Sequence, residues 1–105
     1  MSIEQFEEMA LSFPGTVAAA HFDRVAFKVV NKRIFATLHE ESGVANLKFS
    51  AAEQSVFCSV NKKAAYPVAK KWGLQGWTSF ELKKMDKAPM LDALDTAYKD
   101  VLKKR

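Results

Sequence analysis

Residues 25–49 decide the fold, and they read VAFKVVNKRIFATLHEESGVANLKF. Apolar residues recur at every second position in three short runs, a period of two that is typical of strands with one buried face. The apolar faces are Val25, Phe27 and Val29, then Ile34, Ala36 and Leu38, then Ala45, Leu47 and Phe49. The polar joints at residues 31–32 and 40–43 are short enough for tight connections. The stretch therefore predicts a three-stranded antiparallel meander.

Helical spacing of apolar residues flanks this meander on both sides. It is found in three segments, residues 2–12, 51–59 and 88–103. The first two segments open with the spacing of a capping box, Ser2 with Gln5 and Ser50 with Glu53. Asp86 is placed to cap the last segment. We therefore expect a helix before the meander, one directly after its third strand and one at the end of the chain.

Between the second and third helices the pattern is less regular. Residues 61–76 contain Pro67, Gly73 and Gly76 and show no clear period, whereas residues 77–82 alternate and favour a fourth strand. Helices at both ends of a mainly antiparallel, about four-stranded sheet place the chain in the α+β class. With 105 residues, of which 49% are hydrophobic, residues 1–105 are expected to form a single domain.

The sequence carries no motif of a catalytic, cofactor or metal site. Its four glycines are too scattered for a phosphate-binding loop, and Cys58 lies in a helical segment beside no recognisable base. The single cysteine excludes an internal disulfide, and with only two histidines, His21 and His39, it excludes a closed Cys/His zinc site. We therefore predict no catalytic residue, metal or cofactor, and no enzymatic activity. The absence of a long apolar run and of a signal-like start predicts a cytoplasmic protein without a membrane contact.

The charge points to an anionic partner. The formal net charge is +4, and most of the basic residues follow residue 60, where several stand in adjacent pairs and one pair, Lys70-Lys71, is close to Trp72 and Trp77. Basic side chains with aromatic rings nearby are what nucleic-acid binding uses, because the cations replace condensed counterions and a ring can stack on a base. In the phrase 72–78, the glycines and indoles either fix a tight turn against the sheet or place Trp72 at the mouth of a groove.

The chain resembles the MmcQ/YjbR family of small bacterial proteins along nearly its whole length. The similar stretches are residues 13–16 with His21, residues 24–29, 32–38 and 45–49, Glu53-Gln54, Pro67, Ala69, Trp72-Gly73, Gly76-Trp77-Thr78, Leu82 and Ala97-Tyr98. This resemblance implies a compact α+β fold of the frataxin-like, double-wing type, for which DNA binding has been proposed. On that basis the candidate nucleic-acid contacts are Lys28, Lys32, Arg33, Lys62, Lys63, Lys70, Lys71 and Trp72.

Three functions follow from these observations. The leading hypothesis is a non-catalytic DNA-binding protein that grips phosphates with basic loops and reads little sequence. The second is a protein-interaction or chaperone-like adaptor, which would need a contiguous exposed apolar patch. The third is a small-ligand module with a pocket near Trp72 and His39. The default oligomeric state is a monomer.

Overall fold

A computed structural model describes residues 1–103 of the chain, and within them six strands form one antiparallel sheet. The strands are β1 (Thr16–His21), β2 (Arg24–Val29), β3 (Ile34–His39), β4 (Val44–Lys48), β5 (Ala65–Pro67) and β6 (Trp77–Glu81). Their order across the sheet is β1-β2-β3-β4-β6-β5, and each neighbouring pair is antiparallel. The α+β class is confirmed, but the prediction of about four strands was wrong.

The two missed strands form the edges of the sheet. β1 reads TVAAAH, and all its residues after Thr16 are exposed, so it shows no alternation of buried and exposed side chains. It is a strand because it pairs residue by residue with β2, from Thr16 opposite Val29 to His21 opposite Arg24. β5 has only three residues and ends at Pro67. Both strands depend on pairing with a neighbour rather than on a local pattern.

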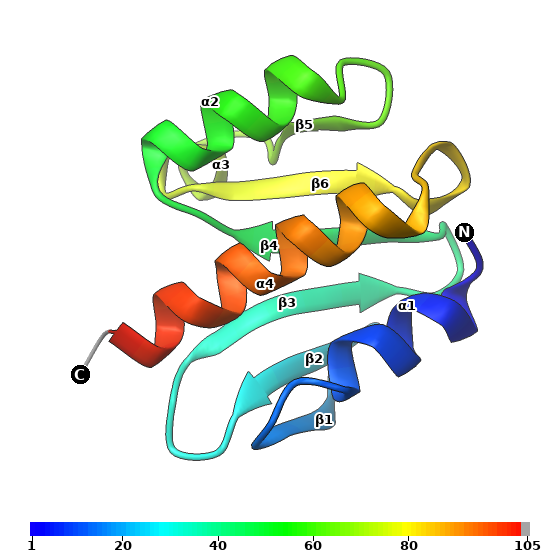
Figure 1. Ribbon diagram of the computed structural model, residues 1–105, viewed down its shortest axis with the longest axis vertical. Helices are drawn as coiled ribbons and strands as arrows, with labels where there is room; N and C mark the ends of the chain where they lie inside the picture. The colour runs from blue at the N-terminus through cyan, green and yellow to red at the C-terminus, as the bar shows by residue number, and fades with distance from the viewer. Residues whose placement is uncertain (104–105) are drawn as a thin grey trace.

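The helices are α1 (Ile3–Leu11), α2 (Ala51–Val60), α3 (Lys71–Leu74) and α4 (Lys87–Lys103), with a short 3-10 turn, η1 (Leu82–Lys84), after β6. The three predicted helices are confirmed to within a residue or two, and both capping boxes form as expected. In Figure 1, α1 and α4 lie across one face of the sheet, and α2 lies beside β5 and β6. In residues 1–103 no helix combines the length and the apolar character that crossing a membrane requires.

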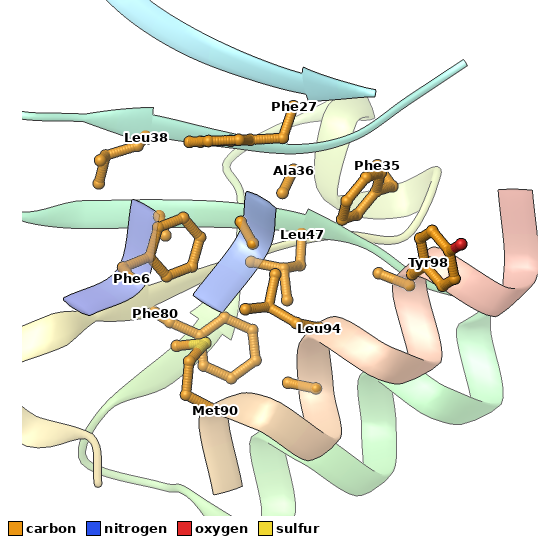
Figure 2. Packing of buried hydrophobic residues seen from close by; sticks show 14 of the residues in the cluster. Phe6, Phe27, Phe35, Ala36, Leu38, Leu47, Phe80, Met90, Leu94 and Tyr98 are labelled. Atoms are coloured by element: carbon orange, nitrogen blue, oxygen red, sulfur yellow. The ribbon is translucent and has the colours of Figure 1, made fainter. Parts of the chain in front are cut away.

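The core lies between the sheet and these helices. Figure 2 shows Leu47 and Phe80 of the sheet facing Met90 and Leu94 of α4, and all four side chains are fully buried. At the α1 side of the core, Phe6 packs edge-to-face on Phe27 with the ring centres 5.7 Å apart. Burial of large apolar side chains at this single interface is the main source of stability.

A β-bulge changes which side chains of β3 enter the core. Phe27 pairs with Ala36 but Lys28 pairs with Ile34, so Phe35 is an extra residue in the ladder. The sequence pattern placed Ile34 on the apolar face, whereas the structure buries Phe35 against Tyr98 of α4, with ring centres 5.8 Å apart. Ile34 is thereby released to the opposite face of the sheet.

Candidate functional site

The face of the sheet opposite α1 and α4 carries a row of polar side chains. Ala26, Thr37, Asn46 and Ser79 are register partners across four adjacent strands, so they share this face. Thr37 is only 8% exposed, and the Ser79 hydroxyl donates a 2.7 Å hydrogen bond to Oδ1 of Asn46. We call this surface the free face. Buried polar side chains are less common than buried apolar ones, so the polar centre of this face is an informative feature.

A pocket of about 320 Å³ lies over this polar row. It is lined by His21, Arg24, Thr37, Asn46, Val68, Trp72 and Trp77, and we call it the free-face pocket. Among the residues that the structure describes, Nη1 of Arg24 is covered from solvent and has no hydrogen-bond partner. Covering part of a guanidinium without a hydrogen-bond partner is costly, and an anion bound in the pocket that this side chain lines would offset part of that cost.

A second hollow of about 480 Å³ adjoins the pocket and shares both tryptophans with it. We call it the basic groove, and its lining residues are Lys28, Lys32, Arg33, Ile34, Lys48, Trp72, Gln75, Trp77 and Val101. Lys28, Lys32 and Arg33 come from the β2–β3 hairpin, whose turn is held by a 2.9 Å hydrogen bond from Lys32 N to the carbonyl of Val29. Lys48 reaches the groove because it pairs with Trp77 in the β4–β6 register.

The short helix α3 positions Trp72 between the two hollows. Trp72 is 53% exposed, and the Lys71 ammonium lies 5.9 Å from the centre of its ring, within the range of a cation–π contact. The side-chain amide of Gln54 in α2 donates to the carbonyl oxygens of Gly73 at 2.9 Å and Trp77 at 3.1 Å. Gln54 thus ties both ends of the indole-bearing turn to α2.

Gly73 and Gly76 allow the tight backbone path of residues 72–78. Gly76 adopts φ of +104°, and a Cβ there would overlap the carbonyl oxygen of Phe49. Gly73 has an ordinary φ, but a Cβ on it would overlap the carbonyl oxygen of Val68. Both glycines are therefore required by close backbone approach. This tight path leaves Trp77 half-buried at the start of β6 and presents Trp72 outward, so both interpretations of the phrase apply.

The structure divides the predicted nucleic-acid residues into two groups. Lys28, Lys32, Arg33 and Trp72 line the basic groove, and Lys70 and Lys71 adjoin Trp72 at the start of α3. The remaining two, Lys62 and Lys63, line a different hollow with Lys84. They precede β5, whose first residue pairs with Phe80 near the end of β6, whereas the basic groove lies where β6 begins.

Sequence reasoning missed Arg24, Lys48 and Gln75 as lining residues. Lys48 and Gln75 line the same hollow because β4 pairs with β6, a contact between segments about thirty residues apart that no local pattern reveals. Of the two histidines, His21 lines the free-face pocket. His39 instead forms a hydrogen bond with the hydroxyl of Ser42, and its Nε2 lies 3.2 Å from a carboxylate oxygen of Asp23. The pocket near Trp72 thus involves His21 rather than His39.

Other reactive groups stand apart from these hollows. Cys58 is half-buried in α2, and burial raises the pKa of its thiol, which keeps it in the less reactive protonated form. Within residues 1–103, no cluster of three or more His, Cys, Asp or Glu side chains is arranged to hold a metal ion.

The fold and its hollows define a small α+β protein in which a six-stranded antiparallel sheet carries an indole-lined, basic hollow. The YjbR family model matches residues 11–100, so the chain belongs to the YjbR family. The resemblance seen in the sequence is confirmed.

The fold is also found in a solved structure. The chain is similar to the Deinococcus radiodurans protein DR2400, whose crystal structure is described with the domain DUF419, at a TM-score of 0.83 and 16% sequence identity. The similarity covers 98% of this chain and 80% of the other, and it extends to the fold. No curated protein matches the chain.

Proposed function

We propose that this protein is a non-catalytic, cytoplasmic DNA-binding protein that holds a DNA strand in the basic groove. The observation that carries the proposal is the convergence of Lys28, Lys32, Arg33 and Lys48 on one hollow that is also walled by Trp72 and Trp77. Cationic side chains beside an accessible indole are the combination that single-stranded nucleic-acid sites use. The lysines and arginine contact phosphates, and an unpaired base stacks on Trp72.

The same geometry favours weak sequence preference. Phosphate contacts fix position but carry no sequence information, and stacking on an indole accepts every base. The groove walls supply cations, indoles and one amide, Gln75. A strand of mixed sequence is therefore the appropriate ligand for a first test.

The adaptor hypothesis has less support from the surface. The large exposed apolar side chains of the described residues are spread over many elements: Leu11 in α1, Val17 in β1, Phe22 in the β1–β2 turn, Val30 after β2, Val56 and Val60 in α2, Tyr66 in β5, Trp72 and Leu74 in α3, and Leu91 and Leu102 in α4. Scattered apolar side chains are normal on a protein surface and do not by themselves indicate a docking site.

The test is fluorescence anisotropy of a labelled single strand and of the matching duplex. About four phosphate contacts predict a slope near −3 for the single strand, so a fourfold rise in salt should weaken binding by about fifty-fold. We expect the single strand to bind more tightly than the duplex, because only the strand offers an unpaired base to Trp72.

Two charge reversals of equal size locate the site. The double variant Lys32→Glu/Arg33→Glu alters the basic groove, and Lys62→Glu/Lys63→Glu makes the same change in net charge at the other end of the sheet. We expect the first to weaken binding by at least about tenfold and the second by about twofold or less. Equal losses would mean that only net charge attracts the strand, and absence of binding at low salt would overturn the proposal.

A further inference from the structure

The free-face pocket is built to receive an anion. Its polar lining groups are the guanidinium of Arg24, the ring of His21, the hydroxyl of Thr37 and the amide of Asn46, and none of its lining residues within 1–103 carries a carboxylate. Since Oδ1 of Asn46 already accepts the Ser79 hydroxyl, the NH₂ group is the part of that amide left for a ligand. Hydrogen-bond donors therefore dominate the pocket.

Arg24 supplies a positive charge to the lining of the pocket. Its Nη1 is covered from solvent and lacks a partner within the described part of the chain, although its side chain lines an accessible pocket. A guanidinium in such a place is best satisfied by an oxyanion, with which it forms strong charge-assisted hydrogen bonds. Thr37 is 8% exposed, lies on the neighbouring strand β3 and lines the same pocket as Arg24.

The two tryptophans determine what carries the oxyanion. Trp72 and Trp77 line both the free-face pocket and the basic groove, so a ligand in the pocket lies directly beside the proposed path of a strand. Indole walls favour a planar ring next to the anion. A phosphate monoester attached to a nucleoside has both parts.

We infer that the free-face pocket binds the terminal phosphate monoester of a nucleotide, with Arg24 on the phosphate and the base against an indole. The choice of carrier rests on the proposed function, whereas the anion specificity rests on the pocket alone. Two sources have this chemistry: the 5′-phosphorylated end of a strand and a free nucleoside monophosphate.

The experiment compares two strands of the same sequence, one with a 5′-phosphate and one with a 5′-hydroxyl. One additional charge-assisted contact should make the phosphorylated strand bind about tenfold more tightly. Arg24→Gln should abolish this difference, and Arg24→Lys, which keeps the charge, should retain part of it. A thermal melt of each variant verifies that it is folded.

Arg33→Gln is the matched control. Arg33 lines only the basic groove of the two hollows, so its loss should weaken binding of both strands equally and leave the ratio between them unchanged. A nucleoside monophosphate is titrated separately while tryptophan fluorescence is recorded, because both tryptophans of the chain line the pocket.

The outcomes separate the two proposals. A phosphate preference that Arg24→Gln removes and Arg33→Gln preserves supports the inference. Equal binding of the two strands by the native protein overturns the inference and leaves the groove proposal standing. Binding of the monophosphate that requires Arg24, with no binding of either strand, supports the pocket and overturns the groove proposal. Failure of all ligands overturns both.

Discussion

The hydroxyl of Tyr98 donates a 2.6 Å hydrogen bond to the carbonyl oxygen of Pro14, 84 residues earlier in the chain. This bond joins α4 to the turn between α1 and β1. The ring of Tyr98 also packs against Phe13 and Phe35, with ring centres 4.9 and 5.8 Å away. One side chain thus connects the last helix, the first turn and the bulge of β3.

Replacing Tyr98 by Phe should lower the free energy of unfolding by about 1 kcal/mol, because the ring contacts persist while the carbonyl of Pro14 loses its donor. Urea denaturation of the two proteins measures the difference. Tyr98→Ala should cost about 3 to 5 kcal/mol, since it also leaves a cavity in the core. Equal stability of native protein and Tyr98→Phe would mean that water replaces the phenol at this carbonyl.

Gly76→Ala should be among the most damaging single changes to this chain. The added Cβ would overlap the carbonyl oxygen of Phe49, and φ of +104° is already unfavourable for alanine. We expect a loss above about 4 kcal/mol, the range of severe core defects.

Gly43→Ala is the matched control for this change. Gly43 also has a positive φ, +70°, but a Cβ there would meet nothing within 4 Å. It should cost only about 1 to 2 kcal/mol, from the backbone conformation alone. Thermal melts of both variants measure the stability that each loses. Similar losses would mean that the backbone around Gly76 shifts easily to accommodate the added Cβ.

Gln54→Ala should loosen the turn that carries Trp72. The variant loses two hydrogen bonds to backbone carbonyls, those of Gly73 and Trp77, so about 1 to 3 kcal/mol of stability should be lost. Binding of the single-stranded DNA in the anisotropy assay should weaken as well, because the indole of Trp72 is no longer held in place. Ser55→Ala, on the exposed side of the same helix, should change neither property.

Glu7→Gln should stabilise the protein at neutral pH. Partial burial, followed by the nearby charges of Glu40 and Glu4, raises the pKa of Glu7 in the folded state. An acid with a raised pKa is unfavourable in its charged form, so the folded state is penalised above that pKa and the penalty disappears as the pH falls below 4.5.

The melting temperature of Glu7→Gln should therefore exceed that of the native protein at pH 7, and the two should converge near pH 4. Glu8→Gln makes the same charge change at the neighbouring exposed position and serves as the control. A gain that Glu8→Gln reproduces would indicate a general effect of net charge rather than the burial of Glu7.

Much of the fold could be predicted from local patterns. The alternation of residues 25–49 predicts β2, β3 and β4, and the capping boxes at Ser2 and Ser50 place the starts of α1 and α2 correctly. These features are encoded within a few residues, where propensity and periodicity act directly. β1 was missed because its three central alanines carry no large apolar side chain to mark a buried face.

The site depended on contacts that local patterns do not contain. Lysine pairs look alike in the sequence, yet Lys70 and Lys71 adjoin Trp72 whereas Lys62 and Lys63 line a hollow at the other end of β6. In the sequence Arg24 looks like any other basic residue in a strand. The burial of its Nη1 becomes apparent only in the folded sheet. Non-local pairing fixed which of the charges share a surface.

The strand order has a consequence for the dynamics of binding. Residues 16–48 supply the cationic wall of the basic groove, residues 65–81 supply the indole wall, and within the sheet the two segments are joined by the ladder between β4 and β6. If the β4–β6 ladder opens transiently, the groove is lost while β1 to β4 remain paired. A DNA strand that contacts both walls of the groove should therefore stabilise the closed β4–β6 ladder. Amide hydrogen exchange should therefore slow on binding more in β4 and β6 than in β1 and β2. Uniform slowing across the sheet would show that the two segments open only together.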